Sequence, residues 1–179
     1  MSSRTSTPPV DLDDLDAALA AMQKEREELG EQVTRAAPGV SAWSSAQHLY
    51  HVALATDLAL RNVRSLCARK GRLITMEGGP TGLALEVLEA GTYPRGESEA
   101  PRMVQAPDEV DLSFLEMEMK GNRDAADQVR LLLEQIPDAP GFIPHHVLGG
   151  LSAGHWLRFA AMHARHHLAI VRDIRAELG

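Results

Sequence analysis

The strongest constraint on the fold is the apolar periodicity of Gly154–Ile174, near the end of the chain. At 100° per residue, the apolar side chains of this stretch gather on one face, as a core-facing α-helix requires. The residues on that face are Trp156, Phe159, Ala160, Ile170, Val171 and Ile174. His163 and His167 lie near its middle, and His166 lies at its edge. Residues four apart are neighbours on a helix, so the two central imidazoles can point at one object.

Two histidines in an apolar stripe are costly to bury unless they are hydrogen-bonded or coordinate a metal. A single histidine of this kind is usually satisfied by a backbone carbonyl. An H-x-x-x-H pair alone is also a weak metal signal, because two imidazoles hold a divalent ion loosely. The sequence therefore predicts a metal site only if a third ligand comes from another part of the chain.

The candidate for this third ligand is His51, in the helical stretch Ser41–Ala68. His51 lies on the apolar face of that stretch, whereas His48 lies further round. The residues alone leave two interpretations equally weighted. His51 is either a metal ligand or a buried histidine satisfied by Gln47 or by a backbone carbonyl.

Four stretches have the length and apolar spacing of long helices, and none shows the alternation of a half-buried strand. They are Asp11–Arg35, Ser41–Ala68, Glu109–Ile136 and a last helix that Ser152 can cap and that runs to about Leu178. Leu73–Asp108 is rich in glycine and proline and predicts a long crossover, with a turn or two of helix at Leu83–Leu88. We therefore predict an all-α fold, an up-down four-helix bundle with a long crossover between helices two and three.

The size and composition fit one soluble domain. The chain has 179 residues, of which 44% are hydrophobic and 24% charged. We expect a flexible N-terminal tail over residues 1–10 and a single domain over 11–179. The net charge of −7 argues against binding to nucleic acid, and no apolar run reaches the length of a membrane span. The single cysteine, Cys67, fits a reducing cytoplasm, so we expect a cytoplasmic protein.

The spacing of the histidines resembles that of the DinB-like metal-binding superfamily, which includes bacterial thiol S-transferases and mycothiol-dependent maleylpyruvate isomerase. The matching motifs are W-S-x6-H at Trp43–His51, H-x3-H at His163–His167 with Trp156 before it, and the turn residues His145, Gly149 and Leu151. The resemblance covers nearly the whole chain. It implies that His51, His163 and His167 hold a divalent ion, that His166 is a neighbour of the site, and that His48 is structural. Ile170 stands where many members carry glutamine, and His146 replaces a proline of the turn.

Three imidazoles leave coordination positions open for water or a thiolate, and they suit Zn²⁺ or Ni²⁺. The resemblance implies a metal-dependent S-transferase-like enzyme in detoxification or stress response, which joins a low-molecular-weight thiol to an electrophilic substrate. The alternative is a non-catalytic metal-binding or stress-induced bundle protein whose partner is unknown. A homodimer is a further expectation.

The two segments rich in glycine and proline, Leu73–Pro107 and Pro137–Gly150, are expected to frame the opening above the metal. They carry four polar groups that a substrate can use: Arg95, Arg102, His145 and His146. Each of these residues singly is more often an ordinary solvated loop residue. Taken together, at least one is expected to line the approach, and an arginine there suits an anionic thiol.

Overall fold

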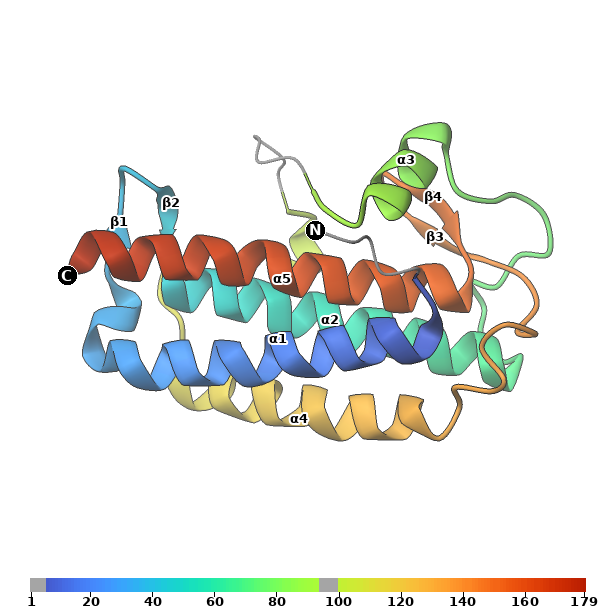
Figure 1. The fold of residues 1–179 in the computed structure, drawn as a ribbon, viewed down its shortest axis with the longest axis horizontal. Helices are drawn as coiled ribbons and strands as arrows, with labels where there is room; N and C mark the ends of the chain where they lie inside the picture. Colours follow the sequence, from blue (N-terminus) through green and yellow to red (C-terminus); the bar gives the residue numbers. More distant parts are fainter. Residues whose placement is uncertain (1–5, 94–99) are drawn as a thin grey trace.

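The protein is all-α, with two small β-hairpins, in a computed structural model that describes residues 6–93 and 100–179 (Figure 1). The four long helices are α1 (Pro8–Leu29), α2 (Ser45–Ala68), α4 (Leu112–Arg130) and α5 (Ala153–Leu178). The shorter elements are α3 (Gly82–Ala90), the 3₁₀ turns η1 (Gly30–Thr34) and η2 (Arg102–Val104), and the antiparallel pairs β1 (Ala36–Ala37) with β2 (Ser41–Ser44) and β3 (Ile143–His145) with β4 (Gly149–Leu151).

The first helix is shifted toward the N-terminus relative to the predicted Asp11–Arg35. It begins at Pro8, whose fixed φ suits the first turn of a helix, so residues 8–10 of the expected tail are helical. Residues 1–5 lie outside the described residues. The helix ends at Leu29, because Gly30 adopts a φ of +52° that other residues rarely take. The chain then continues as a 3₁₀ turn rather than as α-helix.

The other predicted helices differ from the structure only at their ends. Ser44 caps α2 through the main-chain N–H of Gln47, and the residues before Ser45 form β2 instead of helix. Asp111 caps α4 at its start, and that helix ends at Arg130 rather than Ile136. The last helix follows its predicted cap, Ser152, as expected. The hairpins were not predicted, because strands of two to four residues are too short to show alternation.

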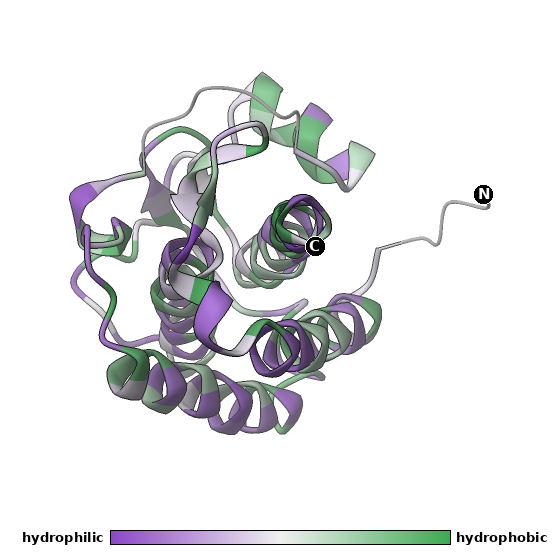
Figure 2. Ribbon diagram, turned by 90° about the vertical axis from the view of Figure 1, so that its left-hand side faces the viewer, coloured by the Kyte–Doolittle hydropathy of each residue, from purple (hydrophilic) through white to green (hydrophobic). Residues whose placement is uncertain are grey.

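The four long helices pack side by side, and Figure 2 looks along them. Helix α2 contacts both α4 and α5, and α1 contacts the same two helices from the other side. In the predicted up-down bundle, each long helix would run antiparallel to the one before it. Instead α2 and α4 run in the same direction, since Gln47 donates to the carbonyl of Pro107 and Arg64 donates to Gln128. The long connection after α2 carries the chain back to the end of the molecule where that helix began.

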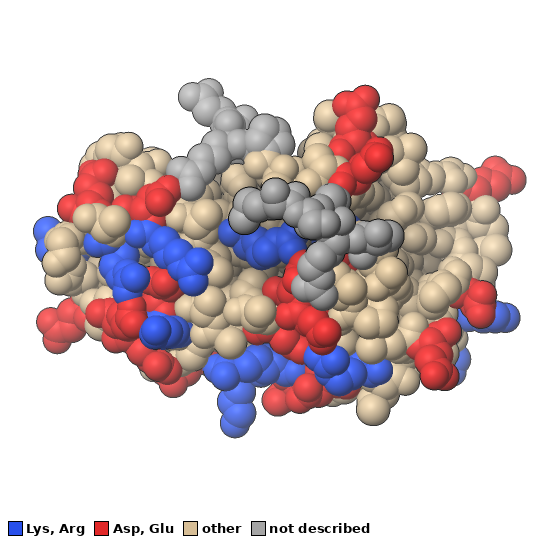
Figure 3. Space-filling view, viewed as in Figure 1, with Lys and Arg blue, Asp and Glu red and all other residues tan. Residues whose placement is uncertain are grey.

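A row of ion pairs joins α1 to α5 along their length. Arg158, Arg165 and Arg172 are spaced seven residues apart on α5, so they lie on one face two turns from each other. They pair with Asp11, Asp14 and Glu25 of α1. Basic and acidic side chains are intermixed on the face drawn in Figure 3. Because the partners follow one another in the same order, α1 and α5 are parallel, and the register of α5 is fixed from its outer side.

The interior between the long helices is mostly aliphatic. Its largest fully buried side chains, which include Leu12, Leu15, Leu49, Leu60, Leu115, Leu157 and Met162, come from all four long helices. Burying a side chain of this size contributes roughly 1.5–3 kcal/mol to folding. This core holds α2 and α5 in the register on which the histidine cluster depends.

Among the described residues, no helix is both long and apolar enough to cross a lipid bilayer.

Candidate metal centre

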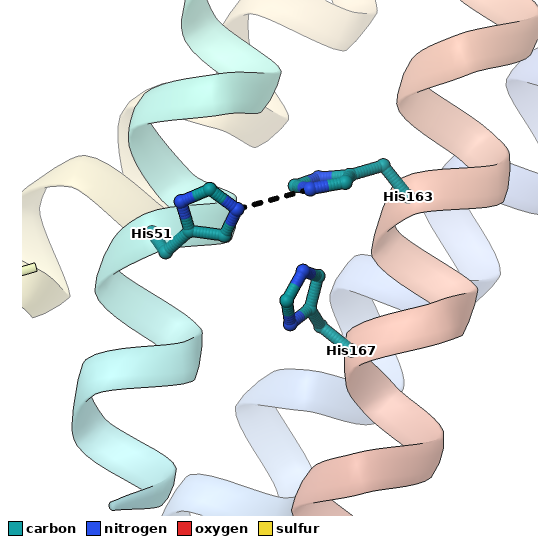
Figure 4. A group of neighbouring side chains, drawn as sticks. All are labelled: His51, His163 and His167. Atoms are coloured by element: carbon teal, nitrogen blue, oxygen red, sulfur yellow. Dashed lines mark hydrogen bonds between the residues drawn. The ribbon is translucent and has the colours of Figure 1, made fainter. Parts of the chain in front are cut away.

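The antiparallel contact between α2 and α5 brings the three predicted histidines together. His51 projects from α2, and His163 and His167 project from successive turns of α5 (Figure 4). Each offers one ring nitrogen, and these three atoms lie within 4.8 Å of one another. Within residues 6–93 and 100–179 this is the one group of His, Cys, Asp or Glu side chains arranged so that it can hold a metal ion.

His51 is oriented by the main chain of η2. Its Nδ1 lies 2.7 Å from the carbonyl oxygen of Val104. A carbonyl only accepts hydrogen bonds, so Nδ1 of the neutral ring carries the proton and donates it to Val104. The lone pair of the ring is therefore on Nε2, which lies 3.0 Å from Nε2 of His163.

His167 is oriented by a second histidine of α2. Its Nδ1 lies 3.0 Å from Nδ1 of His48, and Nε2 of His48 lies 2.9 Å from the hydroxyl of Ser41. Figure 4 shows the other ring nitrogen of His167 turned toward His51 and His163. Two of the three candidate ligands thus have one nitrogen bound to the protein and the other facing the cluster.

The distance between the donors of His51 and His163 suits a small divalent ion. Metal–nitrogen bonds of roughly 2.0–2.1 Å with angles of about 90–109° place neighbouring nitrogens about 3.0–3.4 Å apart. The 3.0 Å between the Nε2 atoms of His51 and His163 falls at the short end of that range. The donor set is all imidazole, which favours zinc, nickel, copper or iron over magnesium and calcium.

The cluster is uncharged at neutral pH. Burial lowers the pKa of His51 and His167 and holds the pKa of His163 well below its usual value, and neighbouring histidines lower the last two further. Burial also lowers the pKa of His48 to about 4. Neutral imidazole is the form that coordinates a metal, so no proton has to be displaced from an imidazolium before an ion binds.

Aromatic side chains surround the cluster. The ring of Phe159 is stacked on His163, with 5.2 Å between their centroids, and Trp43 lies 5.5 Å from His51. Tyr93 meets His163 edge-on at 6.3 Å, and its buried hydroxyl has no hydrogen-bond partner among the described residues. These rings form a mostly apolar surround, in which electrostatic interactions are stronger than in water.

The other residues singled out from the sequence differ in burial and in their contacts. His145 is half-buried beside Phe159, and its Nδ1 accepts the main-chain N–H groups of Val147 and Leu148. His166 is half-buried, and its ring contacts those of Tyr93 and His167. Arg102 and His146 are exposed. Arg95 lies outside the described residues.

Three groups at the site have roles that sequence reasoning did not assign. The Val104 carbonyl has no sequence signal, because any residue offers a carbonyl and η2 is 53 positions from His51. Tyr93 lies in a segment without periodicity. His48 carried a detectable signal, since it lies one helical turn before His51, but the helical wheel placed it off the apolar face.

These features define the class of the protein as all-α, with a partly buried three-histidine cluster between two antiparallel helices. Residues 13–171 match the family model of the DinB superfamily, and the chain therefore belongs to that superfamily. Searches of the curated proteins and of the solved structures each gave no match.

The buried neutral histidines predict acid sensitivity of the metal-free protein. In the unfolded chain a histidine binds its proton near pH 6.5, whereas the pKa of folded His48 is about 4. Between these values only the unfolded state gains protons, so the free energy of unfolding falls as pH drops below 6.5, and for His48 this loss is complete below about pH 4. Through the shift of His48 alone, the free energy of unfolding is expected to be about 1.4 kcal/mol lower at pH 5.5 than at neutral pH. Urea unfolding of EDTA-treated protein at pH 7.5 and 5.5 measures the change, and equal stabilities at the two pH values would contradict it.

Proposed function

We propose that His51, His163 and His167 bind one divalent ion, Zn²⁺ or Ni²⁺, and that the protein is a metal-dependent thiol S-transferase-like enzyme. The observation that carries the proposal is the convergence of three ring nitrogens from α2 and α5 within 4.8 Å. Membership of the DinB superfamily adds support. The DinB-like four-helix bundle, with its crossover between the second and third long helices, is part of the same proposal. So are a cytoplasmic location and a homodimer.

The residues around the cluster suit an ion with open coordination positions. Three protein ligands leave at least one position of a tetrahedral ion free, which is typical of catalytic rather than structural sites. When bound there, the metal supplies a Lewis acid that stabilises a thiol in its thiolate form. Val104 and His48 hold two of the rings in place. Phe159 and Trp43 limit the access of water to the donors.

The loop that follows α3 offers groups for a thiol and an electrophile. The hydroxyl of Tyr93 is buried beside His163, and burial raises its pKa further above its usual value, so it stays protonated and can donate a hydrogen bond. Arg102 lies in the same turn as Val104, whose carbonyl holds His51. Its guanidinium is exposed and always charged, which suits a carboxylate of an anionic thiol.

A second candidate is a non-catalytic metal-binding or stress-induced protein. The observation in its favour is the partial enclosure of the donors: His51 is 6% exposed, His163 and His167 are half-buried, and Phe159 covers one face of the His163 ring. A site enclosed to this degree also suits an ion that stabilises the fold without reacting. The two candidates share the metal and differ in whether a thiol reaches it.

The metal is expected to stabilise the folded protein, because the unfolded chain presents no preformed three-histidine site. Addition of Zn²⁺ or Ni²⁺ to EDTA-treated protein should raise the melting temperature. At a free ion concentration about 100 times the dissociation constant, the gain is about 2.7 kcal/mol. His163→Ala should abolish the rise, and the matched variant His166→Ala should largely keep it. An equal loss in both variants would show that the two rings do not differ in role.

Thiol conjugation tests the catalytic part of the proposal. Metal-loaded protein should accelerate the reaction of glutathione, bacillithiol or mycothiol with an electrophile such as chlorodinitrobenzene, and EDTA treatment should remove the acceleration. Arg102→Ala should raise KM for an anionic thiol, with a smaller effect on kcat, because the arginine binds ground and transition states alike. Lys120→Ala, on α4, is the control for loss of a surface charge. Metal binding without acceleration for any of the three thiols would favour the non-catalytic candidate.

A further inference from the structure

A chain of three polar side chains runs from the histidine cluster to β2. Nδ1 of His167 lies 3.0 Å from Nδ1 of His48, and Nε2 of His48 lies 2.9 Å from Oγ of Ser41. Oγ of Ser41 also accepts the main-chain N–H of Trp43 at 3.1 Å. His48 is 5% exposed, so both of its nitrogens are satisfied by protein groups rather than by bulk water.

Two proton arrangements satisfy this chain. In the first, Ser41 donates to His48 and His48 donates to His167, so that Nε2 of His167 bears a proton and has no lone pair to offer. In the second, His167 donates from Nδ1 to His48, and His48 donates from Nε2 to Ser41, which is already an acceptor for Trp43. Only the second arrangement leaves a lone pair on Nε2 of His167, the nitrogen that faces His51 and His163.

We propose that His48 is a positioning residue, which fixes His167 in the tautomer and orientation needed for coordination by accepting the Nδ1–H of His167 and donating to Ser41. The inference rests on the proposed metal site and is independent of whether the protein transfers thiols. His48 accepts the Nδ1–H of His167 in the same way as the Val104 carbonyl accepts the Nδ1–H of His51. A partner of this kind typically contributes 10–100-fold to metal affinity, by holding the ring and raising its basicity.

Coordination by His48 itself is the competing role, and the geometry disfavours it. His48 faces Nδ1 of His167, the side of that ring opposite to the cluster. The group of residues whose ligand atoms can share one ion comprises His51, His163 and His167 without His48. An ion that used His48 would have to sit outside the point where the other rings converge.

Metal affinity of the full chain tests the role directly. Zn²⁺ dissociation constants are measured by competition with a chromophoric chelator, and the Co²⁺ spectrum of each variant reports the ligand field. His48→Leu places an apolar side chain of similar size at this position and removes both contacts. The affinity for Zn²⁺ should therefore fall by roughly 10–100-fold. His48→Asn places an amide oxygen where His48 has Nδ1, so it should recover most of the loss. Thr56→Val is the matched control, because Thr56 is also buried on α2 and its hydroxyl has no partner among the described residues.

The melting temperatures of the EDTA-treated variants establish that they are folded. If His48→Leu fails to fold, Ser41→Ala removes the far end of the chain and should lower Zn²⁺ affinity in the same direction by a smaller factor. X-ray absorption should count three imidazoles on Zn²⁺ in the wild type and in His48→Leu. Wild-type affinity in His48→Leu, no recovery in His48→Asn, or the loss of one imidazole from the count would each overturn the proposal. A wild-type protein that binds no Zn²⁺ would overturn the metal site as well.

Discussion

The antiparallel packing of α2 against α5 is the contact on which the rest of the structure depends. It sets His51 opposite His163 and His48 opposite His167, so that histidines far apart in the sequence form two facing pairs. The ion pairs from α1 fix α5 from its other side. A slip of one turn between α2 and α5, about 5.4 Å, would separate both pairs at once. The register of two helices therefore decides whether the cluster exists.

Burial of so many imidazoles has a cost that the site must offset. Each buried polar nitrogen needs a partner, and the protein supplies one for Nδ1 of His51 and one for Nδ1 of His167. Within the described part of the chain, the inward-facing Nε2 atoms of His51 and His163 contact each other. A divalent ion would satisfy all of them together, which is why the same geometry that is expensive for the free protein favours metal binding. The open positions of that ion are where chemistry would take place.

The sequence predicted the all-α class, the positions of the four long helices and the meeting of His51 with His163 and His167. The class and the helices follow from apolar periodicity, which is a property of single helices. The choice of His51 as the third member of the cluster also needed the resemblance to the DinB-like superfamily, because the residues alone left it open. The groups that orient the ligands were not predictable in this way. The contact between Val104 and His51 joins η2 to α2, and the contact between Ser41 and His48 depends on a four-residue strand. Such contacts depend on how the elements are placed in space, which periodicity does not encode.

The central claim is that three histidines from α2 and α5 share one ion, and the direct test is a crystal structure of the metal-loaded protein with anomalous scattering at the metal edge. The account predicts a single anomalous peak roughly 2.0–2.2 Å from one nitrogen each of His51, His163 and His167. In that structure Val104 and His48 should still contact the opposite nitrogens of His51 and His167. A peak elsewhere, or one bound by His48 in place of His167, would contradict the account.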